Sequence, residues 1–200
     1  MTLGLVTAIV AFAFVSSITP GPNNMMLMAS GANFGVRASL PHMAGVSLGF
    51  GVMVLVVGLG LAGIISALPW LYGVLRWVGA AYLLYLAFKI ATAHGLGSKA
   101  AAARPVTFVQ AAAFQWVNPK AWAMALGATT TFATRDHLVV DVALITLMFI
   151  LVGAPCIGAW AVFGVGMKRL LTRPWSMRAF NIGMALLLVA SLYPLFTETR

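Results

Sequence analysis

Acidic residues are almost absent from this sequence of 200 residues, which holds three of them against twelve Lys and Arg. The acids are Asp136, Asp141 and Glu198, and one cysteine accompanies three histidines. A single cysteine cannot form a disulfide within the chain, and so few carboxylates, thiols and imidazoles do not make a metal site. Metal transport and metal-dependent hydrolysis are therefore poorly supported, and we expect neither a metal nor another cofactor.

Charge of either sign is scarce, since 8% of the residues are charged whereas 62% are apolar. A soluble domain has about 45–50% apolar and about 25% charged residues. A spanning helix needs about 20 apolar residues, so six of them would use about 120 positions, close to the whole apolar content. The composition predicts an all-α, polytopic membrane protein with a single integral membrane domain over residues 1–200. Its basic residues lie between apolar runs, where orientation in the bilayer explains them, so nucleic-acid binding is not expected.

Six apolar segments follow one another, and the first and fourth are each interrupted by proline beside asparagine. The interruptions are Pro22-Asn23 and Asn118-Pro119. The first run resembles a signal-peptide core but has no basic residue before it and no small-residue cleavage site, so we expect it to remain in the mature protein. Whether this segment spans fully or is re-entrant stays open. The expected spans are 3–32, 39–65, 69–91, 107–132, 137–166 and 174–193.

The chain divides into two halves of similar length, residues 1–93 and 107–200, joined by a polar connector at 94–106. Each half has three expected spans, and an odd number gives the two halves opposite orientations. Each third span also opens with Pro-Trp, at Pro69 and Pro174. Matched interruptions in corresponding segments are typical of inverted-repeat transporters that bind substrate at the repeat interface. The sequence predicts an inverted 3+3 repeat with broken first and fourth helices.

The two interruptions are also the predicted substrate site. Proline removes a backbone donor, and the groups left unpaired within a membrane need protein or water partners. The amides at the breaks can line a pathway or only cap the backbone, and Lys120 can meet a substrate carboxylate or cap carbonyls. Half-helix amino ends attract carboxylates, so this arrangement suits a small zwitterion. The candidate substrate-binding residues are Pro20, Gly21, Pro22, Asn23, Asn24, Gln115, Asn118, Pro119 and Lys120.

Four further residues carry open alternatives. Asp141 is the one carboxylate expected inside a span, so by elimination it leads as a proton carrier; an interfacial acid balanced by Arg135 or His137 is the alternative. His42 is expected in a structural or interfacial role near the cytoplasmic end of the second span, and His42 and Lys120 follow Asp141 as proton-carrier candidates. The small residues Gly45 and Gly49 permit close helix packing, either within the chain or in a homodimer.

At these motifs the sequence resembles the lysine exporter (LysE/RhtB) family of bacterial amino-acid exporters. The matching elements are residues 19–23 (Thr-Pro-Gly-Pro-Asn), 31–49 with Arg37, 79–83 (Gly-Ala-Ala-Tyr-Leu) and 118–120 (Asn-Pro-Lys), and the resemblance covers nearly the whole chain. It implies a multi-pass protein of the bacterial cytoplasmic (inner) membrane. It also implies export of amino acids from the cytoplasm, driven by the proton-motive force.

The distribution of charge bears on the substrate. The expected second span has no acid and the fourth contains Lys120, so a cationic substrate side chain would have no counter-charge in a low dielectric. We expect neutral or hydroxylated substrates such as threonine or homoserine. The alternatives are a metal or inorganic-ion exporter of related fold, which the shortage of acids and thiols opposes, and a non-catalytic membrane scaffold subunit. No nucleophile and base are brought together inside the spans, so an enzyme is not expected.

Basic residues in the connections predict the orientation of the chain. Eight lie on one side of the expected bilayer and three on the other, so the eight are assigned to the cytoplasm and both termini to the outside. A re-entrant first segment would move the amino terminus to the cytoplasm and leave the rest unchanged. The eight are Arg37, Lys89, Lys99, Arg104, Lys168, Arg169, Arg173 and Arg178, and the three are Arg76, Arg135 and Arg200.

This assignment predicts the accessibility of three positions. Reporters fused within the 94–105 connector and after Arg169 are expected to read as cytoplasmic, and a reporter at the carboxyl end is expected to read as external. Paired fusions to alkaline phosphatase and green fluorescent protein measure this directly. A cytoplasmic carboxyl terminus would contradict both the orientation and the inverted repeat.

Overall fold

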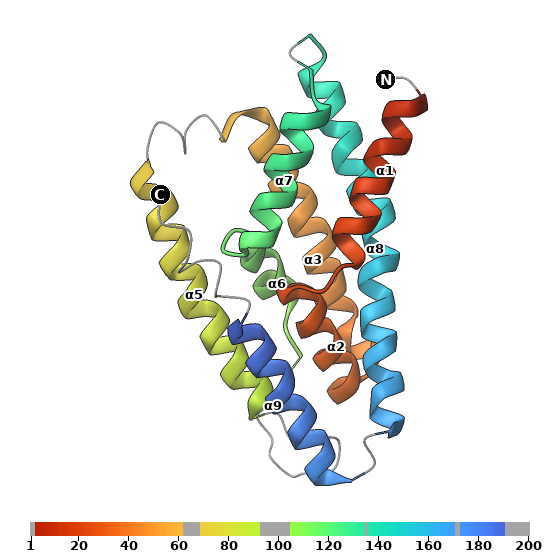
Figure 1. Ribbon diagram of the computed structural model, residues 1–200, viewed down its shortest axis with the longest axis vertical. Coiled ribbons are helices and arrows are strands. Elements are labelled where there is room, and N and C mark those ends of the chain that lie inside the picture. Colours follow the sequence, from red (N-terminus) through yellow and green to blue (C-terminus); the bar gives the residue numbers. More distant parts are fainter. Residues whose placement is uncertain (1–2, 62–68, 93–104, 135, 171–172, 191–200) are drawn as a thin grey trace.

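The computed structural model describes residues 3–61, 69–92, 105–134, 136–170 and 173–190, and the regular structure in these ranges is all helical (Figure 1). The predicted all-α class is therefore confirmed. The elements are α1 (Leu3–Ile18), α2 (Pro22–Phe34), α3 (Val36–Val56) with its continuation η1 (Val57–Leu61), α5 (Pro69–Ala91), α6 (Phe108–Gln115), α7 (Pro119–Phe132), α8 (Leu138–Leu170) and α9 (Pro174–Ala190).

Helices long and apolar enough to cross a membrane are present within the described ranges. Val36–Gly60 and Leu138–Met167 pass this test as single helices, and α1 with α2 passes it as a pair bent by 56°. Each of the six predicted apolar segments contains a helix, and the first and fourth are broken at the predicted positions. The ends of the second and sixth predicted spans and most of the connector lie outside the described residues.

The two halves run in opposite directions along the molecule. In Figure 1, α1 and α2 descend, α3 ascends and α5 descends, whereas α6 and α7 ascend, α8 descends and α9 ascends. Some helix contacts are equivalent when the two halves are exchanged: α1 packs on α8, and α6 packs on α3. Corresponding helices of the two halves also contact each other, since α3 contacts α8 and α5 contacts α9. The contact of α2 with α8 is more extensive than that of α7 with α3, so the packing of the two halves is not fully equivalent.

Proline sets the start of the second helix in each broken segment. Pro22 and Pro119 occupy the first turns of α2 and α7, where a missing N–H costs no helical hydrogen bond. Asn118 caps α7 because its side chain accepts a hydrogen bond from the Lys120 backbone N–H. Between α2 and α3, Gly35 adopts φ 82°, a left-handed conformation that glycine tolerates without steric cost.

Small residues let the two halves approach closely. A Cβ added at Gly31 would overlap the carbonyl of Ala161, and one at Gly164 would overlap the carbonyl of Met28, so α2 and α8 touch through their backbones. Between α3 and α6, Gly45 abuts Phe108 and Ala111, and Gly49 abuts Ala112. Gly45 and Gly49 therefore serve packing within the chain.

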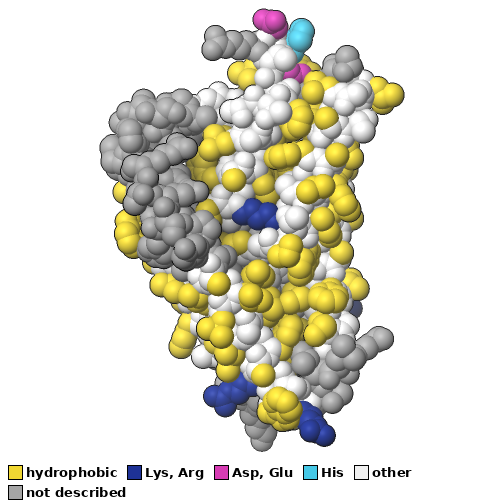
Figure 2. Space-filling model, viewed as in Figure 1, with side chains coloured by type: hydrophobic (Ala, Val, Ile, Leu, Met, Phe, Trp, Pro, Cys, Tyr) yellow, Lys and Arg dark blue, Asp and Glu magenta, His cyan; other side chains and the backbone are white. Residues whose placement is uncertain are grey.

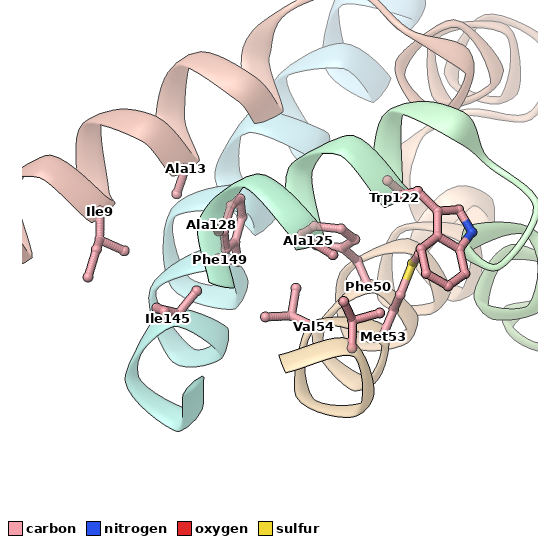
Figure 3. Packing of buried hydrophobic residues seen from close by; sticks show 12 residues of the cluster. Ile9, Ala13, Phe50, Met53, Val54, Trp122, Ala125, Ala128, Ile145 and Phe149 are labelled. Atoms are coloured by element: carbon pink, nitrogen blue, oxygen red, sulfur yellow. The ribbon is translucent and has the colours of Figure 1, made fainter. Parts of the chain in front are cut away.

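The described residues form four apolar clusters, and two of them involve exchanged sets of helices. The larger cluster joins α1, α3, α7 and α8; in Figure 3 its side chains converge around Phe50, Phe149 and Ala125. The rings of Phe50 and Phe149 pack edge to face with centroids 5.1 Å apart. The smaller cluster joins α2, α3, α6 and α8 through Leu27, Val46, Ala111 and Ile157. We refer to them as the α1–α7 cluster and the α2–α6 cluster.

Charged side chains on the visible face sit mainly at its two ends. In Figure 2, basic side chains gather at the lower end and acidic and histidine side chains at the upper end, with one basic patch at mid-height. The band between the ends is largely apolar. This distribution matches a molecule whose ends contact water and whose middle contacts lipid.

The backbone contact between α2 and α8 predicts the effect of a single methyl group. Gly164→Ala should destabilise the protein by about 1–3 kcal/mol, as overpacking does, because the new Cβ meets the Met28 carbonyl. Thermal unfolding of the purified protein in detergent measures this as a lowered midpoint. Gly166→Ala, two residues along the same helix with nothing within 4 Å, is the control and should not lower it. Equal midpoints for the two variants would contradict the packing described.

Candidate substrate site

The break between α1 and α2 leaves backbone carbonyls without helical partners, and side chains from two other helices contact them. Asn24 of α2 donates to the carbonyls of Ser17 and Thr19 at 2.8 and 2.7 Å. The indole N–H of Trp160 on α8 donates to the carbonyl of Ile18 at 3.1 Å. Each unpaired backbone group in hydrocarbon would cost several kcal/mol, so these bonds make the break possible.

Lys120 completes the set of bonds at this break. Its Nζ donates to the carbonyl of Thr19 at 2.7 Å, to the Thr19 hydroxyl at 2.9 Å and to the carbonyl of Pro20 at 3.3 Å. Gly21 makes room for the Lys120 stem, since a Cβ there would lie 2.7 Å from its Cδ. A cation at the carboxyl end of α1 is also favoured by the helix dipole. Of the two hypotheses for Lys120, the contact present here is carbonyl capping.

The second break is closed by its own neighbours. The indole N–H of Trp122 donates to the carbonyl of Trp116 at 2.8 Å, and Asn118 Oδ1 accepts from the backbone of Lys120 at 3.1 Å. The backbone N–H of Asn118 donates to the carbonyl of Gln115. The chain therefore turns at residues 116–118, and hydrogen bonds across the turn hold the end of α6 against the start of α7.

A pair of amides links the two breaks directly. Asn23 Nδ2 donates to Gln115 Oε1 at 2.9 Å, and Gln115 Nε2 donates back to Asn23 Oδ1 at 3.2 Å. Gln115 is fully buried and also donates to the carbonyl of Ala111. Because α2 belongs to the first half and α6 to the second, this pair joins the halves at the level of the breaks.

A pocket of about 490 Å³, part of it in an open mouth, lies where the breaks meet. The amino-terminal ends of α2 and α7 both border it, and they contribute backbone N–H groups and positive dipole ends that favour an anion. Serine hydroxyls and apolar side chains form the remaining walls, and no carboxylate is among the lining residues. The lining residues are Ser16, Ser17, Gly21, Asn23, Asn24, Val46, Ser47, Phe50, Gln115, Asn118, Lys120, Ala121, Met124, Phe149, Gly153 and Ile157.

The predicted site residues divide into two groups. Six of the nine line this pocket, whereas Pro20, Pro22 and Pro119 shape the breaks and do not line it. Sequence reasoning missed the pocket residues of α3 and α8, because an all-apolar segment does not show which face of its helix turns inward. Trp160 was missed as a partner of the break for the same reason. Ser17 and Ser47, polar residues inside apolar runs, were the available signal.

Asp141 lies apart from this pocket. Its carboxylate accepts hydrogen bonds from the backbone and hydroxyl of Thr134 at 2.9 and 2.7 Å, which ties the start of α8 to the end of α7. Phe149, the first pocket residue along α8, is eight residues further on, about 12 Å along the helix. Arg135, one of its expected partners, lies outside the described residues.

Comparisons with known proteins agree with one another. The profile of the LysE type translocator family matches residues 14–191. The chain is 36% identical over 201 residues to the cysteine/O-acetylserine efflux protein of Escherichia coli (strain K12), covering 94% of this chain and 96% of that protein. It is 35% identical over 194 residues, with the same coverage, to the protein of that name in Salmonella paratyphi A (strain ATCC 9150 / SARB42). No solved structure matches.

The amide pair predicts an energetic coupling between the halves. Asn23→Ala and Gln115→Ala should each destabilise the protein, and the double variant should lose less than their sum by about 0.5–3 kcal/mol, since each removes the same bonds. Chemical unfolding in detergent measures all three. As a control, Asn23→Ala combined with Asn181→Ala, which pairs with Asn33 elsewhere, should be additive within about 0.3–0.5 kcal/mol. Additivity in the Asn23/Gln115 cycle would contradict the direct pair.

Proposed function

The chain belongs to the LysE type translocator family, and we propose that it exports small neutral amino acids from the cytoplasm across a bacterial inner membrane. The proposed architecture is the inverted 3+3 repeat of six spans with a substrate site at its centre. Export is coupled to protons that move in the opposite direction. The protein acts as a transporter and not as an enzyme.

The observation that carries this proposal is the convergence of two half-helix amino ends on one pocket. A substrate carboxylate is favoured there by the N–H groups and dipoles of α2 and α7. The side-chain oxygens of Asn23, Asn118 and Gln115, which border the same space, can accept from a substrate ammonium group. A zwitterion thus finds partners for both of its charges without any charged side chain other than Lys120.

Lys120 supports the site indirectly in this proposal. Its ammonium group is bonded to Thr19 and Pro20, so it holds the break that gives α2 its free amino end. Its positive charge at the rim also favours a substrate carboxylate over distances that do not require contact. Lys120→Arg would keep the charge but not the compact shape of the ammonium group.

The composition of the pocket favours a small, uncharged and partly polar substrate side chain. No carboxylate among the lining residues can balance a basic side chain, while Ser16, Ser17 and Ser47 offer hydroxyl groups. The related proteins are named for efflux of cysteine and O-acetylserine, and both compounds fit this description. Threonine and homoserine, which the sequence alone favours, fit it as well. The proposed substrate class is therefore small amino acids with a hydroxyl, thiol or ester side chain.

Counterflow in proteoliposomes tests the proposal. Purified protein in vesicles loaded with unlabelled L-cysteine should take up labelled L-cysteine, and loading with O-acetyl-L-serine, L-threonine or L-homoserine should identify the exchanged substrates. L-Lysine should support little exchange, because its side chain would enter without a counter-charge. A chain that exchanges L-lysine but none of the neutral amino acids would refute the substrate class.

Variants at the breaks test the site. Asn118→Ala and Lys120→Met should each lower the initial rate of counterflow by tenfold or more, about 1.4 kcal/mol or more, because the amino end of α7 and the carbonyls of the first break lose their partners. Thr130→Ala is the matched control, since this exposed hydroxyl of α7 bonds only within its own helix. Wild-type rates for well-expressed Asn118→Ala and Lys120→Met would favour a scaffold role instead.

A further inference from the structure

His42 is a fully buried imidazole for which the protein provides no hydrogen-bond partner. Its side chain is 0% exposed, and neither Nδ1 nor Nε2 has a partner. Buried polar atoms are almost always paired, and those that are not require an explanation. Within a membrane segment, an ionisable residue is in addition expensive unless it has a function. His42 lies within the candidate span Val36–Gly60.

The position of His42 places it next to the substrate pocket and between the halves. Val46, one turn further along α3 and about 6 Å away, lines the pocket and belongs to the α2–α6 cluster. Gly45, three residues after His42, abuts Phe108 and Ala111. Residues three apart share a helix face, so His42 points toward the start of α6. It therefore lies beside the α2–α6 cluster, whose residues Val46 and Ala111 follow it on α3 and face it from α6.

Among the side chains that the structure describes, no charged group faces this imidazole from the helices packed around α3. In the described ranges, α2, α6, η1 and residues 105–107 contain no titratable side chain. On α7, Lys120 is bonded to Thr19 and Pro20. On α8, Cys156 is the titratable residue closest in register and is buried, since Met43 packs at Gly158.

Three remaining groups are separated from His42 or engaged elsewhere. Asp141 lies at the far end of α3, because its neighbour Val142 abuts Gly58, which is sixteen residues or about 24 Å from His42. On α3 itself, Arg37 is exposed. The hydroxyl of Ser39 donates to Gly35 and pairs with Ser30, so it is not available to the ring.

We propose that His42 is the proton-binding site of the transport cycle, an inference that rests on the proposed export function. A proton that enters the pocket from the outer side binds the imidazole as substrate leaves. The imidazolium form of His42 needs two hydrogen-bond acceptors, and it has none while the α2–α6 cluster is closed to water. Protonation therefore favours the state in which this cluster opens and admits water from the cytoplasm. There the proton leaves, the neutral ring can be buried again, and substrate binds for the return step.

The geometry separates His42 from the two other ionisable candidates. At Asp141, Oδ2 accepts both hydrogen bonds from Thr134, at the end of the protein and about 12 Å or more along α8 from the pocket. Lys120 has its three donors directed at two carbonyls and a hydroxyl, and its proton is part of the structure of the break. Of these three residues, only His42 lies near the pocket and also has polar side-chain atoms without a hydrogen-bond partner among the described residues.

The test compares proton-driven accumulation with exchange in the same vesicles, with full-length protein and labelled L-cysteine kept reduced. Vesicles about one pH unit more acidic inside should accumulate L-cysteine up to about tenfold if one proton leaves for each molecule that enters. His42→Gln should exchange L-cysteine as the wild type does but fail to accumulate it. A pH-sensitive dye inside the vesicles should report proton movement on addition of L-cysteine for the wild type and none for His42→Gln.

Two control variants make the result specific. His137→Gln carries the same substitution at an exposed position in the α7–α8 turn, and Asp141→Asn removes the carboxylate at the end of the protein; both should accumulate L-cysteine. Accumulation by His42→Gln would overturn the proposal. Loss of accumulation with retained exchange in Asp141→Asn would also overturn it, whether or not His42→Gln folds. A wild type that exchanges none of the tested amino acids would instead refute the export function.

Discussion

The satisfaction of four carbonyl groups at the end of α1 governs much of this structure. A helix that stops inside a membrane exposes carbonyls to a medium that cannot hydrogen-bond them. Here the carbonyls of residues 17–20 accept from Asn24, Trp160 and Lys120, which belong to three different helices. The break therefore cannot form in the first half alone. It needs α7 and α8 of the second half in place, and this requirement fixes how the halves dock.

The same requirement generates the pocket. Each break that ends one helix also begins another, and the amino ends of α2 and α7 retain N–H groups that no preceding turn can bond. Asn23 at the amino end of α2 bonds to Gln115 at the carboxyl end of α6. Close approach of α2 to α8 and of α3 to α6, which glycines permit, brings the polar groups within bonding distance. Fold and pocket thus depend on one set of contacts.

The pocket lies between two apolar clusters built from exchanged helices. Phe50 and Phe149 connect it to the α1–α7 cluster, and Val46 and Ile157 connect it to the α2–α6 cluster. In the proposed inverted repeat, opening one cluster while closing the other would give alternating access with little change inside each half. In the proposed role of His42, a buried imidazole beside the α2–α6 cluster makes the opening of that cluster sensitive to protonation, which entirely apolar surroundings would not do.

The sequence by itself determined the helical membrane class, the six apolar segments, the two breaks and the family resemblance. These follow from composition and from proline, which act locally and need no tertiary context. It also singled out Asn23, Gln115, Asn118 and Lys120, because polar groups in apolar segments are conspicuous. Tertiary structure alone decided their partners: that Lys120 bonds to Thr19, that Asn23 bonds to Gln115 across 92 positions, and that Asp141 bonds to Thr134. It also decided which faces of α3 and α8 turn inward and left His42 without a partner, since these depend on helix rotation and docking, which a uniformly apolar sequence does not encode locally.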